Sequence, residues 1–228
     1  MLSVSKIKNN VITRNIGEKA VKFSRILIYP NKFSSERYVR FLREKGVEVG
    51  ENVRFNSPTT ISIDVTRPSL VTICDDVQLT RGTTVLTHDN TGRLIKNKYG
   101  YQFNSAGEVK INENVYVGNH VTILKDVEIG ANSIISSCSL VNKDIPPNVV
   151  AGGVPAKKLM SLDEFYEKRK QEQLSEAKEY AQAFERRHGR RPTEEEFSGF
   201  QHLFSHQEDT NVETTFDSFE AFLDHCDA

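Results

Sequence analysis

The sequence has no tryptophan, three cysteines and no apolar run of the ~20 residues that a membrane-spanning helix needs. Cys74, Cys138 and Cys226 are odd in number and far apart, which argues against a disulfide framework and against a thiolate zinc site. The first twenty residues contain lysines but no apolar core followed by small residues, so no signal peptide is expected. These absences favour a reducing compartment, and we expect a cytoplasmic protein without a transmembrane segment.

An excess of charge of one sign is also lacking. The 228 residues include 30 Lys and Arg against 31 Asp and Glu, which leaves a formal net charge of −1. This balance argues against a broad nucleic-acid surface, and no nucleic-acid partner is expected. The length suffices for one sizeable domain with an extension.

What the sequence does contain is a six-residue repeat. Its first position is apolar at twelve of thirteen places: Val49, Phe55, Ile61, Ile73, Leu79, Val85, Ile111, Val117, Ile123, Ile129, Ile135 and Val141, with Arg67 as the exception. The position four residues later is always Val, Thr or Ser. Gly, Asn or Asp often follows the apolar residue, as at Gly50 and Gly118, where we expect corners with positive φ.

A period of six fits neither a helix nor a simple hairpin meander, and it predicts an all-β solenoid of short parallel strands around an apolar axis. The pattern resembles the left-handed parallel β-helix of hexapeptide repeats, in which three hexapeptides make one coil. The stretch 47–146 then supplies four to five coils. Arg67-Pro68 interrupts the repeat, and a local bulge is expected there because proline removes a ladder donor.

Three regions follow from this pattern. They are an N-terminal helical cap (1–46), the left-handed β-helix domain (47–160) and a C-terminal helical extension (161–228). A short helix after Ser34 stops at Gly46, and the extension contains helices after Ser161, from Thr193 and near 217–225. Within the middle region the repeat is interrupted by an excursion, 89–108, which is either a functional loop or a disordered insertion.

Three segments carry a more specific signal: Thr87-His88-Asp89, the stretch 115–124 (VYVGNHVTIL), and the stretch 139–157 (SLVNKDIPPNVVAGGVPAK). In this order they resemble the acetyl-CoA-dependent hexapeptide O-acetyltransferases, over about residues 40–160. The resemblance implies transfer of an acetyl group from acetyl-CoA to a hydroxyl of a sugar or polysaccharide precursor, directly and without a metal. It also implies a homotrimer with active sites between neighbours.

The resemblance assigns His88 as the general base, a task that suits an imidazole. His120 is the competing histidine. The backbone N–H of Asn119 matches a position that contacts acetyl-CoA, where a donor also serves the developing oxyanion. Asp89 is a candidate to orient His88, with a backbone carbonyl or another chain as alternatives.

For the cofactor, the resemblance places Ser137 beside the pantetheine arm, and Asn142, Lys143 and Lys157 near the distal half with its phosphates. The family often has smaller residues around Ser137, which makes the pantetheine groove here different. The acceptor candidates are Asp64, Asp89, Tyr101 and Tyr116.

Other functions remain open at this point. A xenobiotic (antibiotic) acetyltransferase and a non-catalytic structural solenoid both fit the repeat. A γ-class carbonic anhydrase needs three convergent histidines for zinc, and the repeat has only His88 and His120. Serine acetyltransferases carry a large helical domain before the repeat, for which the ~45 residues here leave no room.

Overall fold

A computed structural model describes residues 28–204 and 214–227 of the chain. The chain divides into two compact units, the first ending at Leu162 and the second beginning at Asp163. Residues 1–27 of the expected N-terminal cap lie outside the described part. Each unit is treated by itself below.

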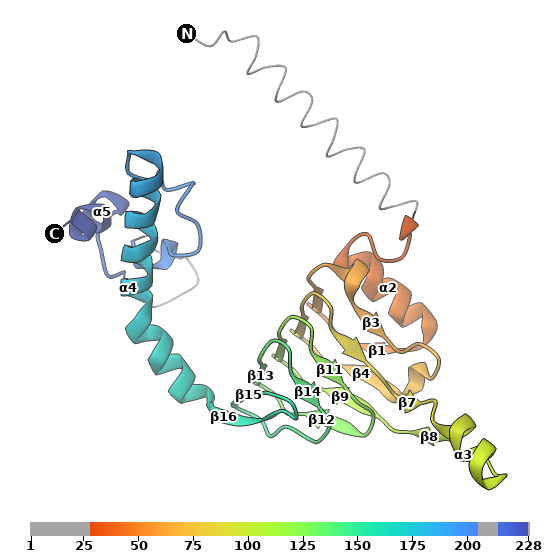
Figure 1. The fold of residues 1–228 in the computed structure, drawn as a ribbon. Helices are drawn as coiled ribbons and strands as arrows, with labels where there is room; N and C mark the ends of the chain where they lie inside the picture. Colours follow the sequence, from red (N-terminus) through yellow and green to blue (C-terminus); the bar gives the residue numbers. More distant parts are fainter. Residues whose placement is uncertain (1–27, 205–213, 228) are drawn as a thin grey trace. The chain divides into compact units, whose positions relative to one another are not determined.

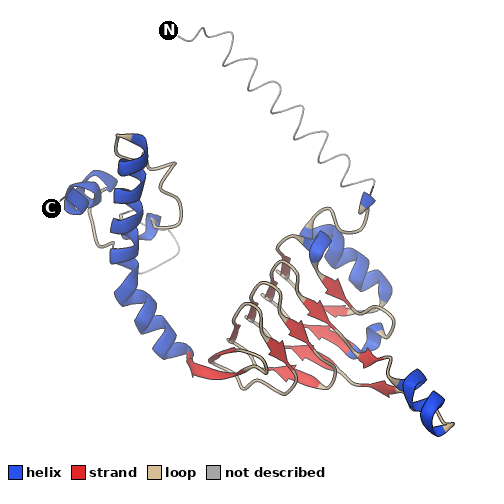
Figure 2. Ribbon diagram, in the orientation of Figure 1, coloured by secondary structure: helices blue, strands red, loops and turns tan. Residues whose placement is uncertain are grey.

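Short strands of the first unit build three sheets, which the chain visits in turn (Figures 1 and 2). Sheet A has the order β1-β4-β9-β12, sheet B the order β16-β15-β13-β10-β5-β2, and sheet C the order β14-β11-β6-β3. All pairs within these sheets are parallel except β15 with β16. The strands are β1 (Glu48–Val49), β2 (Arg54–Phe55), β3 (Ser62–Ile63), β4 (Val71–Ile73), β5 (Gln78–Leu79), β6 (Thr84–Val85), β9 (Val109–Ile111), β10 (Tyr116–Val117), β11 (Thr122–Ile123), β12 (Val127–Ile129), β13 (Ile134–Ile135), β14 (Leu140–Val141), β15 (Val149–Gly152) and β16 (Lys157–Ser161).

The core of this unit is the predicted apolar axis. All twelve apolar residues at the first repeat position are buried. Those on paired strands stack from coil to coil in register, as Leu79, Val117 and Ile135 do, whereas Ile63 instead of Ile61 pairs with Val85. Stacking buries each apolar side chain between its neighbours, so the coils stabilise one another. The parallel-strand architecture predicted from the repeat is confirmed.

The first coil departs from the repeat. Eight residues separate Phe55 from Ile63, and ten separate Ile63 from Ile73, where the repeat predicts six each time. Two 3-10 helices, Pro58–Thr60 and Pro68–Leu70, take up the added residues. Instead of the bulge expected at Arg67-Pro68, proline begins a 3-10 turn, for which its fixed φ is suited. Because the six added residues equal one repeat, the six-residue frame resumes unchanged at Ile73.

The corners also differ from expectation in detail. Positive φ occurs three residues after the apolar position, at Asn52, Asp76, Asn114, Asn132 and Asn148, with φ of 54–58°. Asn and Asp tolerate this left-handed region better than most residues. Gly50 has no positive φ. A Cβ there would collide with Asp75 of the next coil, so this glycine allows close stacking.

Helix α2 (Ser35–Lys45) closes the exposed end of the first coil. The Ser34 side chain accepts the Arg37 N–H at the start of the helix, and Gly46 ends it with φ of 93°. The Phe55 N–H donates to Ser35 Oγ (2.9 Å), and Arg43 Nε donates to the Val49 carbonyl (2.9 Å). The helix therefore provides partners for backbone groups that an open sheet edge leaves unpaired.

The excursion has structure of its own. Strands β7 (His88–Asp89) and β8 (Ser105–Ala106) pair antiparallel, with His88 opposite Ala106, and they carry helix α3 (Gly92–Tyr99). Figure 1 shows this hairpin projecting from the end of sheet C. The excursion is thus an ordered arm that begins at His88.

In the second unit, α4 (Leu162–His188) and α5 (Phe219–Asp227) enclose an aromatic cluster with Phe197 and Phe222 at its centre. The helix predicted from Thr193 is wrong. Glu196 accepts the Thr193 N–H at 3.0 Å, as a capping box does, but Gly199 with φ of 98° stops the chain after one turn. A 3-10 helix, Gln201–Leu203, follows. None of the helices in the described ranges combines the length and apolarity that crossing a bilayer requires.

Candidate active site

His88 and Asp64 form a hydrogen-bonded pair at the corner after sheet C. The β3–β6 register aligns Ile63 with Val85, which places residues 64–66 beside residues 86–88 of the next coil. His88 Nδ1 lies 2.6 Å from Asp64 Oδ2, and the two side chains are 18% and 5% exposed. Asp89, considered above for orienting His88, instead accepts the N–H and hydroxyl of Thr91. The residue that orients His88 is therefore Asp64.

Asp64 is surrounded by hydrogen-bond donors. Its Oδ1 accepts the N–H (2.9 Å) and hydroxyl (2.6 Å) of Thr66, and its Oδ2 accepts the N–H (3.1 Å) and hydroxyl (2.5 Å) of Thr87. Burial alone raises the pKa of this carboxyl, but the bonds from Thr66 and Thr87 outweigh burial and hold the pKa well below its ordinary value. Asp64 is therefore ionised at neutral pH.

The ionised state of Asp64 fixes which ring nitrogen of His88 donates in this contact. A carboxylate has only acceptors, so His88 Nδ1 must supply the hydrogen of the 2.6 Å contact. In the neutral ring the other nitrogen, Nε2, then carries the lone pair. The His88 side chain is 18% exposed, and a ring nitrogen that can accept a proton is what a general base requires.

The predicted cofactor residues Asn142 and Lys143 share this corner of the fold. Asn142 follows β14 as Leu124 follows β11, Leu86 follows β6 and Asp64 follows β3. Neighbouring strands are ~4.8 Å apart, so Asp64 and Asn142 lie about 14 Å apart along the corner. Asn142 and Lys143 are both exposed.

Asn119 and Ser137 lie at a different corner, between sheets B and C. The Asn119 N–H donates to Ser137 Oγ at 3.1 Å, so the two residues are neighbours on successive coils. That N–H is available to a ligand only when the serine hydroxyl turns away. His120 shares this corner with φ of 57°, and a Cβ on Gly82 would collide with its ring.

The remaining candidates are spread over the unit. Lys157 begins β16 opposite Gly152, and it is exposed. Tyr116 lies on the outer face of sheet B and is 40% exposed. Tyr101 lies in the excursion, edge-on to Phe103 with ring centroids 4.9 Å apart. Within one chain, His88 therefore contacts Asp64 and Asn119 contacts Ser137. The first pair follows the strands of sheet C and the second pair precedes them, so the two pairs lie at opposite ends of these strands.

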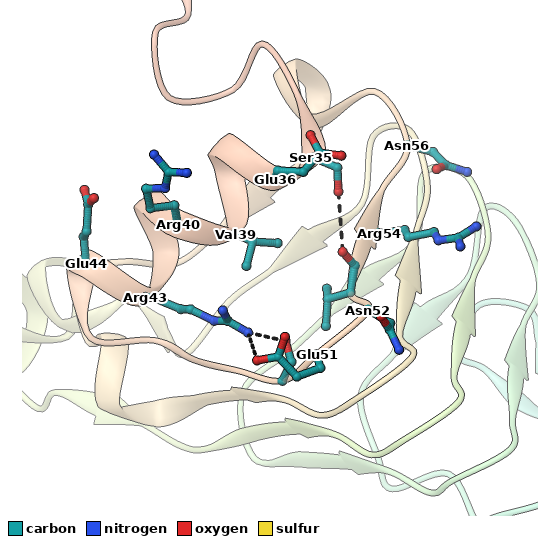
Figure 3. Close-up of a pocket in the computed structure, with 12 residues that line it drawn as sticks. Ser35, Glu36, Val39, Arg40, Arg43, Glu44, Glu51, Asn52, Arg54 and Asn56 are labelled. Carbon is teal, nitrogen blue, oxygen red and sulfur yellow. Dashed lines mark hydrogen bonds and ion pairs between the residues drawn. The ribbon is translucent and has the colours of Figure 1, made fainter.

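A large hollow lies elsewhere, between α2 and the first coil (Figure 3). It has a volume of about 760 Å³ and is lined by none of the residues considered above. Arg43, on its wall, is held by the carbonyls of Val49 and Gly50 and by Glu51. Figure 3 shows Arg40 and Arg54 on different sides of the hollow. Arg43 and Glu51 pair with each other at 2.9 Å, and neither His88 nor Asp64 lines this hollow.

No cluster of three or more His, Cys, Asp or Glu side chains suited to a metal ion occurs within residues 28–204 and 214–227.

Comparison with known proteins bears on this geometry. The profile of the bacterial transferase hexapeptide (six repeats) family matches residues 108–143. Galactoside O-acetyltransferase of Escherichia coli (strain K12) is 38% identical over 128 residues, which are 55% of this chain and 59% of that protein. Protein CapG of Staphylococcus aureus is 35% identical over 124 residues, 54% of this chain and 71% of CapG.

Among solved structures, a hexapeptide-repeat containing acetyltransferase from Vibrio cholerae O1 biovar eltor, complexed with acetyl coenzyme A, is 26% identical. The match covers 62% of this chain and 86% of that chain, with a TM-score of 0.45.

Proposed function

Because the chain belongs to the bacterial hexapeptide-repeat transferases, we propose that it transfers an acetyl group from acetyl-CoA to a hydroxyl of a sugar or polysaccharide precursor. The His88–Asp64 pair, with His88 Nε2 left as an acceptor, is the observation that carries this proposal. The name of the galactoside O-acetyltransferase supports the acceptor class. We also propose that the coils wind left-handed and that residues 47–160 form the catalytic domain. We expect the protein to act in the cytoplasm, where acetyl-CoA is available.

In the proposed reaction, His88 Nε2 takes the proton of the acceptor hydroxyl while that oxygen bonds to the carbonyl carbon of the thioester. The carbon–sulfur bond then breaks, and His88 returns the proton to the departing sulfur of coenzyme A. Asp64 stays ionised throughout and stabilises the imidazolium that forms in between. Since the Asp64 side chain is only 5% exposed, we assign it to orienting His88 rather than to contacting the acceptor.

Acetyl-CoA is assigned to the surface of the coils that carries the predicted cofactor residues. Lys143 and Lys157 supply cations for its phosphates, and Asn142 supplies a polar contact on the corner that also carries His88. Ser137 and the N–H of Asn119 are assigned to the pantetheine arm and the oxyanion. Asp89, Tyr101 and Tyr116 remain the candidates for binding the acceptor.

These residues are divided between the two ends of the strands of sheet C, and this division favours an active site shared between chains. A site that needs both His88 and Ser137 is complete when one edge of a chain faces the other edge of a neighbour. We propose a homotrimer with closed threefold symmetry, in which each active site uses two chains.

The test is the replacement of the base. His88→Ala should lower kcat by roughly 10²–10⁴, which corresponds to about 2.7–5.4 kcal/mol of barrier. Release of the coenzyme A thiol from acetyl-CoA, measured against a panel of sugars, nucleotide sugars and aminocyclitols, reports the rate. His120→Ala is the matched control and should cost much less, because no carboxylate among the residues that the structure describes hydrogen-bonds to that ring.

Equal losses for the two substitutions would exclude His88 as the base. Acetylation of xenobiotics with no turnover of any sugar would overturn the acceptor class. A wild-type protein that releases no thiol with any acceptor would contradict the activity itself.

A further inference from the structure

We propose that the hydroxyl groups of Thr87 and Thr66 are positioning groups for the base. They hold the Asp64 carboxylate in one orientation, and this fixes the tautomer in which His88 Nε2 is free to accept a proton. The inference rests on the proposed function, since it concerns the same site. It adds two residues to that site, neither of which contacts the reacting atoms.

Thr87 supports the oxygen that His88 uses. Its side chain is fully buried, and its hydroxyl donates to Asp64 Oδ2 at 2.5 Å, beside the 2.6 Å contact from His88 Nδ1. Its backbone N–H reaches the same oxygen. Because Thr87 directly precedes His88, the donor that places Asp64 and the ring that Asp64 orients belong to one short segment.

Thr66 supports the other oxygen. Its N–H and hydroxyl both donate to Oδ1, and its Oγ1 lies 3.5 Å from His88 Nδ1. Each carboxylate oxygen therefore receives an N–H and a hydroxyl from one threonine. A carboxylate held at both oxygens cannot rotate away from the ring, and a charged acceptor in a buried place favours donation from Nδ1.

A merely structural role for these hydroxyls is the competing explanation, and the same coil offers a matched control. Thr83 is also fully buried, and its hydroxyl donates to the Thr80 carbonyl at 2.8 Å. None of its described hydrogen bonds involves Asp64 or His88. Thr83→Val therefore removes a buried hydroxyl of the same type without touching the pair.

The experiment compares Thr87→Val, Thr87→Ser, Thr66→Val and Thr83→Val in the full chain. The ring nitrogens of His88 are observed by NMR in protein labelled with ¹⁵N-histidine, and the His88 signals are identified by their loss in His88→Ala. In the wild type, neutral His88 should carry its proton on Nδ1. Thr87→Val should populate the Nε2–H form, while Thr87→Ser and Thr83→Val should keep the wild-type pattern.

Turnover should follow the tautomer. Thr87→Val should lower kcat roughly tenfold, the scale of one hydrogen bond to a charged group, with KM for acetyl-CoA nearly unchanged. The pH–rate profile of this variant should also shift, whereas that of Thr83→Val should not. Thr87→Ser restores the hydroxyl and should restore the rate. If Thr87→Val does not fold, exposed Thr66→Val gives the same comparison at the other oxygen.

An unchanged His88 tautomer in both Thr87→Val and Thr66→Val would overturn the inference, as would a kcat loss equal to that of Thr83→Val. The NMR measurement needs no turnover. A wild-type protein without acetyl transfer, but with a tautomer that depends on Thr87, would refute the proposed function and support the positioning role.

Discussion

At the scale of single residues, the lowered pKa of Asp64 makes the stability of the protein depend on pH. Its pKa is held below the ordinary value, about 4, that it has in the unfolded chain. The folded state is therefore stabilised by ionised Asp64 above pH ~4, and this contribution is lost as the pH falls toward the lowered pKa. We expect the unfolding free energy of the wild type, measured by urea titration, to fall between about pH 5 and pH 3.

Asp64→Asn should be less stable at neutral pH, because the amide NH₂ would face the hydrogen-bond donors of Thr66 and Thr87. Between about pH 5 and pH 3, the unfolding free energy of this variant should fall less than that of the wild type. Asp89→Asn is the comparison, since exposed Asp89 also accepts a hydrogen bond from a threonine, Thr91, but takes no part in the contact between His88 and Asp64. If the unfolding free energy of Asp64→Asn falls with pH as steeply as that of the wild type, this role for the carboxylate is contradicted.

His88 was identified from its motif and its place before the excursion, whereas its partner was not. Asp64 lies 24 residues earlier, and sequence alone does not show that the first coil carries six added residues. Counting in sixes takes Ile61 and Arg67 as axis positions, although the strand that pairs with Val85 contains Ile63. With the ladder known, Asp64, Thr66 and Thr87 fall beside His88. The motif predicts His88 as the base, whereas Asp64 can be predicted as its partner only once the β3–β6 register is known.

At the scale of elements, α2 stabilises the first coil through single polar contacts. The Tyr38 side chain is buried, its hydroxyl accepts the Ile63 N–H at 3.3 Å, and burial raises the pKa of that phenol to about 12. Tyr38→Phe leaves a buried N–H without a partner, which costs about 1–3 kcal/mol. Urea unfolding should show a loss of that size.

Tyr101→Phe removes the same hydroxyl from a side chain that is 66% exposed. Its effect should stay within ~0.5 kcal/mol, as is usual for surface substitutions. A loss as small for Tyr38→Phe would mean that α2 does not provide this sheet edge with a needed partner.

The elements that sequence predicted well are those with a strong period or cap. The repeat identified the strands, and Ser34 and Gly46 bounded α2. Thr193 and Glu196 form the contacts of a capping box and still begin only one turn, because Gly199 takes a positive φ and the phenylalanines on either side of it pack into the aromatic cluster. Local signals indicated a helix start there, and tertiary packing decided against it.

At the scale of the whole molecule, the separation of His88 from Ser137 makes a prediction about assembly. Light scattering at micromolar concentration should give three times the 25.9 kDa of one chain. A stable monomer that retains full activity would exclude a shared site.

Mixing variants tests the sharing directly. His88→Ala and Ser137→Trp, each inactive alone, should regain activity when unfolded together and refolded, since mixed trimers restore up to roughly a quarter of the sites. His88→Ala unfolded and refolded without Ser137→Trp is the control, and it should regain no activity. No recovery in trimers that are shown to be mixed would place both edges of each site in one chain.

The β7–β8 pair has a consequence for how this scaffold can diversify. Its two ends, at His88 and Ala106, lie directly opposite each other. Segments with fixed, adjacent ends accept replacement without disturbing the domain beneath them. The arm is therefore a replaceable segment that begins at His88. If His88 acts as proposed, grafting arms of other lengths and chemistry at these two ends is a route to new acceptors with an unaltered His88–Asp64 pair.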